Sequence, residues 1–385
     1  MRHGQRRTGR WAGLGLAMAL AACAPAASPV LSPSPSATPA PSGDVLVEAA
    51  NAVHGQTAST AQWAGPATGP KRAATGIEID YVVADGTNGG AMAVYDGVRQ
   101  AAEAMGWTAV LRDGVGTPDG RADALMAAIG AKPAAIIFGG FDPSEQRELA
   151  VRAASLDIVL VGWHAGAVAG PSAGSPLFTN VSTRPSEVAL LAANYVIDVS
   201  EGKAGVAIFT DTQYGIAIDK ANLMKAQIER CTGCQVLAYL DIPISESMTQ
   251  MPTAVRNLRN QFKAQLTYLL AINGNYFGGS RSALLQDGVA RGDPPYAVAA
   301  GDGDQAEFER IRSKQYQLAS VAEPLYLQGW QLVDEINRAI AGVGPSDYVP
   351  SPGLITAATV PAEGGVWDPD AAYRATYRRI WAVAP

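Results

Sequence analysis

The alternation of apolar, β-rich runs with amphipathic helical stretches constrains the fold of this chain more than any other feature. One series of such units runs from 77 to 164, and a second runs from 185 to 342. Repeated strand–helix units favour parallel sheets with helices on both faces. Because the break at 177–183 separates the two series, the sequence predicts an α/β protein with two Rossmann-like lobes, each a parallel sheet flanked by helices.

Polar and aromatic side chains follow strand after strand of this pattern at the same topological place. Ligands of open parallel sheets bind beyond the carboxyl ends of the strands. Carboxylates and amides suit ligand hydroxyls, and an indole face suits the apolar face of a sugar. Any one of these residues alone would be an ordinary loop residue, but their repetition predicts a ligand pocket. The candidate ligand-binding residues are Asp85, Asn88, Trp163, His164, Asp211, Tyr214, Asn273, Tyr276, Asp302 and Glu323.

The stretch from about 77 to 345 resembles the type I periplasmic binding proteins, in particular the ribose-binding-like solute-binding lipoproteins of ABC importers. The resemblance rests on the opening strand, loop and helix, on the segment around Asn273, and on 299–308 and 318–340, which match the family's last elements in order. It implies a hinge between the lobes made of three chain crossings. The expected crossings lie near 179–182, 323–324 and 345–350.

The same resemblance implies roles for individual candidates. Trp163 and His164 stand where ribose-like members carry an Asp-Arg pair, so Trp163 is the candidate stacking face, with Tyr214 or Tyr276 opposite. Four other candidates stand at positions that contact the ligand in those members, and they are Asn88, Asn273, Asp302 and Glu323.

The chain also departs from the pattern of sugar binders. Gly90 and Ala91 occupy places where sugar binders often carry two aromatic residues, and Ile218 replaces an expected arginine. Carboxylates without a convergent arginine disfavour an anionic ligand and favour a polyhydroxy or amine-bearing one. These carboxylates are Asp85, Asp302 and Glu323.

The N-terminus has the layout of a bacterial lipoprotein signal. Basic residues in 1–10 precede an apolar run at 11–22, which is too short to span a bilayer, and Cys23 follows Leu-Ala-Ala. This arrangement resembles a lipobox, in which the cysteine is lipidated; an ordinary signal peptide cut nearby is the alternative. The next segment, 24–43, is nearly all Ala, Pro and Ser and predicts an extended tether. We therefore expect an exported protein, lipid-anchored to the cell membrane on its periplasmic or extracellular face.

These features together divide the chain into five parts. A signal peptide at 1–22 precedes the lipidated cysteine and tether at 23–43, and an N-terminal extension follows at 44–76. The N-terminal lobe is expected to comprise 77–180 and 324–347, and the C-terminal lobe 181–323 and 348–385.

The net charge is −6, and removal of 1–22 would take away four arginines and no acid. A chain this acidic is not a nucleic-acid binder by bulk electrostatics.

Cys231 and Cys234 form a close pair in an exported chain, which most simply predicts a structural disulfide. A redox centre or half of a metal site is the alternative, although no second Cys or His pair completes a zinc set.

Near the C-terminus, Tyr373, Tyr377 and Trp381 recur at the spacing of one helical face. This stripe predicts a helix that docks onto a lobe, with a partner contact as the alternative.

Three classes of function fit this sequence to different degrees. The first is a monomeric solute-binding protein that delivers a sugar-like or polyol molecule to an ABC permease, without cofactor or metal. The second is a sensor of the same fold that presents its ligand to a membrane receptor. The third is an enzyme, for which only a His164/Asp302 acid–base pair could be named; the chain carries none of the common hydrolase or phosphate-loop motifs, so we expect no enzyme.

Overall fold

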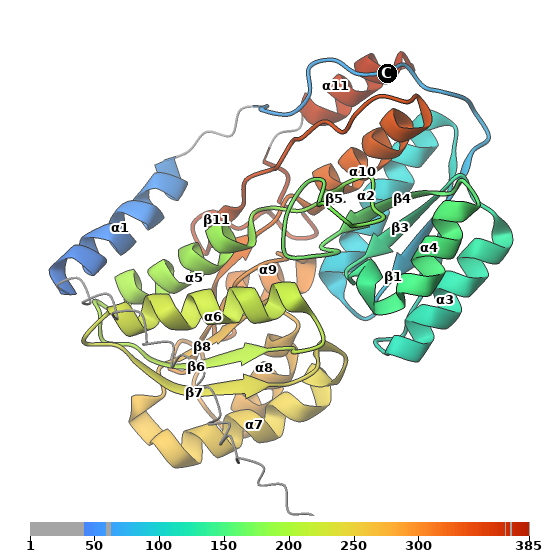
Figure 1. Ribbon diagram of the computed structural model, residues 1–385. Coiled ribbons are helices and arrows are strands. Elements are labelled where there is room, and N and C mark those ends of the chain that lie inside the picture. The colour runs from blue at the N-terminus through green and yellow to red at the C-terminus, as the bar shows by residue number, and fades with distance from the viewer. Residues whose placement is uncertain (1–41, 59–62, 366, 370–371, 385) are drawn as a thin grey trace, which may run out of the picture. The chain divides into compact units, whose positions relative to one another are not determined.

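Figure 1 shows the computed structural model, which describes residues 42–58, 63–365, 367–369 and 372–384. The expected signal peptide at 1–22, the candidate lipidation site Cys23 and the tether up to residue 41 lie outside the described residues.

The first lobe is a five-stranded parallel sheet with strand order β2-β1-β3-β4-β5 and helices on both faces. Its strands are β1 (Glu78–Val83), β2 (Thr108–Asp113), β3 (Ala135–Gly139), β4 (Val159–Trp163) and β5 (Asn180–Val181). Its helices are α2 (Gly89–Met105), α3 (Pro118–Ala131), the short η1 (Pro143–Gln146), α4 (Arg147–Ser155) and α10 (Leu325–Ile340).

The second lobe is a six-stranded sheet with order β11-β10-β9-β8-β6-β7, in which only β11 is antiparallel to its neighbour. Its strands are β6 (Gly205–Thr210), β7 (Gln235–Asp241), β8 (Tyr268–Ala271), β9 (Tyr296–Ala299), β10 (Gln317–Ala322) and β11 (Gly353–Thr356). Its helical segments are α5 (Pro185–Val199), α6 (Gly215–Arg230), η2 (Ile244–Glu246), α7 (Ser247–Phe262), η3 (Lys263–Gln265), α8 (Tyr276–Gln286) and α9 (Gln305–Arg312). The predicted α/β class with two lobes is confirmed.

The sequence fixes the ends of α2, the helix that carries the first polar loop. The side-chain oxygen of Asn88 accepts hydrogen bonds from the backbone N–H groups of Gly90 and Ala91, which caps the N-terminus. Gly106 ends the helix in the left-handed conformation at φ 67°. The loop after β1 is thereby held against the start of α2.

The chain passes between the two sheets at the three expected places. It leaves the first sheet after β5, returns from β10 to α10 at Glu323 and Pro324, and leaves again between α10 and β11. The hydrogen bond from Thr183 to Glu323 joins the first two of these crossings, so they can move together as a hinge.

The N-terminal extension begins with α1 (Ser42–Ala58), which packs on α5 of the second lobe (Figure 1). Residues 63–76 lie instead against the first lobe. There the Asn337 side chain accepts from the N–H of Ala73 and donates to the carbonyl oxygen of Pro70 at 3.0 and 3.1 Å.

The C-terminal helix α11 (Ala372–Trp381) packs on α10 and belongs to the first lobe, as Figure 1 shows. The expected assignment of 348–385 to the C-terminal lobe holds for β11 but is wrong for α11. The reason is the aromatic stripe: Trp381 stacks on Trp330 at 5.5 Å and donates from its indole N–H to Asp334 at 2.7 Å. The stripe is thus core, as the helical spacing predicts.

Helices α2 and α10 approach so closely that a glycine is needed at their crossing. A β-carbon on Gly329 would lie 2.5 Å from the carbonyl oxygen of Val94 and 2.6 Å from backbone atoms of Gly97 and Val98. Real β-carbons do not approach backbone this closely, so any larger residue must push the helices apart.

Gly329→Ala should therefore lower the free energy of unfolding by about 1–3 kcal/mol despite the better helix propensity of alanine. Gly130→Ala in α3 is the matched control, because nothing lies within 4 Å of a β-carbon there. Urea unfolding of both variants tests this packing, and equal stabilisation by both substitutions would contradict it.

Candidate ligand-binding site

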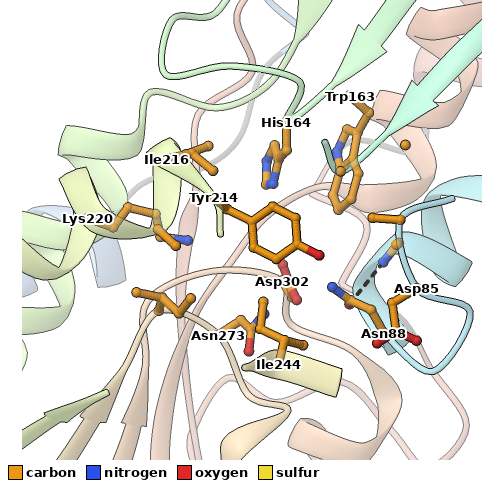
Figure 2. A pocket seen from close by; sticks show the side chains of 16 residues that line it. Asp85, Asn88, Trp163, His164, Tyr214, Ile216, Lys220, Ile244, Asn273 and Asp302 are labelled. Carbon is orange, nitrogen blue, oxygen red and sulfur yellow. Dashed lines mark hydrogen bonds between the residues drawn. The ribbon is translucent and has the colours of Figure 1, made fainter. Parts of the chain in front are cut away.

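A pocket lies between the two lobes, at the carboxyl ends of their strands (Figure 2). The first lobe contributes the loops after β1, β3 and β4, and the second contributes the start of α6 and the loops after β7, β8 and β9. The cavity measures about 60 Å³.

Seven of the ten candidate residues from the sequence line this pocket. The structure therefore brings most of the strand-end candidates together around one cavity. The lining candidates are Asp85, Asn88, Trp163, His164, Tyr214, Asn273 and Asp302.

The structure does not bring the other three candidates to the pocket wall. Tyr276 is fully buried on α8, and its hydroxyl donates to the carbonyl oxygen of Ile242 at 2.9 Å. The Asp211 carboxylate accepts from the backbone N–H groups of Gln213 and Ile244, so it holds the loops after β6 and β7 together. Glu323 lies behind His164.

Glu323 is the centre of a hydrogen-bond network at the hinge. Its carboxylate accepts from the hydroxyl of Thr183 at 2.6 Å and bonds the Nε2 of His164 at 2.9 Å. Gln328 donates to the same carboxylate and accepts from the indole N–H of Trp163 at 2.9 Å. Trp163 and His164 stack on one another with centroids 4.1 Å apart. The network thus fixes the orientation of the two aromatic residues at the end of β4.

Electrostatics favour an ionised Glu323. Burial alone would raise the pKa of this carboxyl, but His164, Lys220 and the Thr183 hydroxyl together hold the pKa well below its ordinary value. Asp302 differs, because burial raises its pKa well above the ordinary range, and Lys220 opposes this shift only in part.

Lys220, which no sequence pattern above indicates, lines the pocket from α6 and is 5% exposed. Its ammonium points into the pocket in Figure 2 and has no hydrogen-bond or ion-pair partner within the described residues. The signal that could have located it is helical spacing, since Ile216 and Lys220 are four residues apart and share one face.

Several polar groups of the pocket are left without partners in the protein. One oxygen of Asp85 and one of Asp302 are buried and accept no hydrogen bond within the described chain. The side-chain oxygens of Asn88 and Asn273 accept from nearby backbone N–H groups, which leaves their amide N–H groups for a ligand. The pocket therefore offers both acceptors and donors among apolar walls, the arrangement of a small-molecule site.

Tyr214 closes the pocket from the second lobe. Its hydroxyl accepts from Arg121 of the first lobe at 3.3 Å, and Arg121 is itself paired with Glu145 through bonds of 2.7 and 2.8 Å. Burial raises the pKa of Tyr214 to about 12. The lobes also touch where a β-carbon on Gly116 would lie 2.6 Å from that of Ser245.

His164, Asp302 and Glu323 can each offer one ligand atom within 4.8 Å of the others. His164 Nε2, however, already bonds Glu323, and the Lys220 ammonium acts on both carboxylates. A neighbouring positive charge opposes a metal cation, so this cluster suits hydrogen bonding better than metal binding.

Away from the pocket, Cys231 and Cys234 form a disulfide at the end of α6, with Cα atoms 5.2 Å apart. The predicted structural staple is confirmed. No helix in the described part of the chain is both long and apolar enough to cross a membrane.

Two parallel-sheet lobes with a polar pocket between them define a class of binding proteins. The sequence model of the periplasmic binding protein domain matches residues 79–343, and this chain belongs to that family. The resemblance inferred from the sequence is confirmed, as is the expectation of a binding protein rather than an enzyme. None of the curated proteins matches the chain.

Solved structures share this fold. A sugar ABC transporter protein from Yersinia enterocolitica has a TM-score of 0.68 at 15% identity, covering 80% of this chain and 95% of that one. A solute-binding protein from Agrobacterium vitis, bound with α-D-tagatopyranose, has a TM-score of 0.64 at 16% identity, covering 75% and 97%. Another from the same organism, with bound allitol, has a TM-score of 0.61 at 14% identity, covering 74% and 97%.

The hinge network predicts a specific acid response. Because the pKa of Glu323 is held below its unfolded value, its ionised form contributes stability at neutral pH, and this contribution fades as the pH falls below about 4.3. Glu323→Gln should be less stable than wild type at pH 7, and the difference should shrink at pH 3.5. Urea unfolding at both pH values measures this difference in the free energy of unfolding. Glu103→Gln, at an exposed position, is the control. A difference between Glu323→Gln and wild type that does not depend on pH would contradict an ionised Glu323.

Proposed function

We propose that this protein is an extracytoplasmic, lipid-anchored solute-binding protein. It captures a sugar-like or polyol molecule in the pocket between its lobes and delivers it to an ABC permease. The observation that carries this proposal is the set of unpartnered, buried acceptors and donors that converge from both lobes, since buried polar groups are normally satisfied.

The ligands of similar structures support a polyhydroxy ligand. Proteins of this fold are bound with α-D-tagatopyranose, allitol and L-arabinofuranose. Each hydroxyl of such a molecule can donate to a carboxylate and accept from an amide or ammonium. The pocket supplies this combination at Asp302, Asn273 and Lys220.

Binding is expected to involve movement of the lobes. The pocket is lined from both lobes, so we propose that the lobes part where the chain crosses between them, admit the ligand, and close again around it. A ligand that contacts both lobes binds the closed form more tightly than the open form, and it therefore shifts the equilibrium toward the closed form. The Arg121–Tyr214 contact across the cleft must break when the lobes open.

The N-terminal segment supplies the proposed anchor. Cys23 follows a short apolar run and precedes a Pro-rich tether of the type that stays extended at about 3.1 Å per residue. Such a tether would hold the lobes at the membrane surface within reach of a permease.

A thermal-shift screen of the full chain tests ligand capture directly. The probes are D-tagatose, allitol, L-arabinose, D-ribose, D-glucose and the amino sugar D-glucosamine. A ligand present at 100 times its Kd stabilises the protein by about 2.7 kcal/mol, which raises the Tm by a few degrees. Asp302→Asn should abolish the shift, whereas Asp123→Asn, an exposed carboxylate on α3, should keep it. No shift with any sugar or polyol would contradict the proposal.

The anchor is tested separately by Cys23→Ser in a bacterial host. Because a thioether-linked lipid needs the cysteine sulfur, the variant should leave the membrane fraction, while wild type stays in it. Equal membrane association of both, measured by fractionation and immunoblotting, would show that Cys23 is not the lipidation site.

A further inference from the structure

We propose that the ligand carries an amine as well as hydroxyls, as in an amino sugar or aminocyclitol, and that its ammonium pairs with Asp85. This inference rests on the proposed function and names the ligand class of the same pocket.

The Asp85 carboxylate lies in the loop after β1. One oxygen accepts from the backbone N–H and the hydroxyl of Thr87, at 2.8 and 2.7 Å. The other oxygen is buried and has no partner within the described residues, and the residue is 6% exposed. A buried carboxylate without a counter-charge is unfavourable, so this position calls for a cationic hydrogen-bond donor.

The surroundings do not supply that cation. Within the described residues Asp85 forms no ion pair and its carboxylate bonds only Thr87, and the nearby cation Arg121 is paired with Glu145 instead. Arg121 is already held by both oxygens of Glu145. This end of the pocket therefore keeps an excess of negative charge that a ligand ammonium would neutralise.

The opposite end of the pocket carries the positive charge of Lys220. Figure 2 shows Lys220 and Asp85 on opposite sides, with Asp302 between them. A β-carbon on Gly301, which has φ +128°, would lie 2.4 Å from the Lys220 ammonium, so the glycine makes room for the charge. A ligand amine would meet repulsion here, whereas a hydroxyl can accept from Lys220 and donate to Asp302.

This polarity orients the ligand. Its hydroxyls face Lys220 and Asp302, and its amine faces Asp85. A neutral sugar would satisfy the first end but leave the Asp85 charge uncompensated, and a sugar acid would add a further negative charge beside it.

Matched pairs of probes test this inference by calorimetry on the full chain at neutral pH. The pairs are D-glucosamine with D-glucose, D-galactosamine with D-galactose, and scyllo-inosamine with scyllo-inositol. In at least one pair the amine should bind at least ten times more tightly than its neutral counterpart. Asp85→Asn should remove this advantage, and Asp123→Asn should retain it. Lys220→Met should weaken the binding of both members of a pair by similar factors. This result would distinguish the role of Lys220 from that of Asp85.

Two results would overturn the inference in distinguishable ways. If neutral members bind wild type as tightly as the amines, or if Asp85→Asn leaves the ratio unchanged, the ligand class is wrong while sugar capture stands. If neither the amines nor the neutral sugars bind, the proposed function itself fails. Retained binding of a neutral probe by Asp85→Asn would show that the variant is folded.

Discussion

The hydrogen bonds of the Glu323 carboxylate connect the hinge to the binding pocket. Glu323 stands at the crossing from β10 to α10, Thr183 stands at the crossing after β5, and His164 directly follows β4. One buried charge therefore ties two of the crossings between the sheets to the aromatic pair beside the pocket. A buried carboxylate is destabilised when it loses a hydrogen-bond partner. A change in backbone geometry at these crossings is therefore expected to change the position of the aromatic pair as well.

The network explains why Trp163 serves mainly as a support. Its indole N–H is bonded to Gln328, one face is covered by His164, and the residue is 2% exposed. The groups left for a ligand are instead short polar side chains on the strand-end loops and one lysine on a helix. Such side chains suit directed hydrogen bonds to a ligand better than stacking against it.

Much of this organisation could be predicted from the sequence, for physical reasons that also explain the failures. Strand-end loops must be polar, so repetition along the chain locates most of the pocket. Lys220 was missed because it lies on a helix face, where a lysine normally reaches solvent. Tyr276 was misplaced because it begins α8 and turns into the core. The docking of α11 on α10 depends on contacts between distant segments, which local patterns do not specify.

The central claim is that the lobes open to admit a polyhydroxy ligand and close on binding it. The most direct test is the distance between spin labels at Asp119 on α3 and Glu246 in η2, two exposed residues on different lobes near the Gly116–Ser245 contact. Without ligand, the account predicts a distribution that includes long distances, and saturation with a probe that raises the Tm should shift it to one short distance. An unchanged distribution when such a probe binds would contradict closure around the ligand.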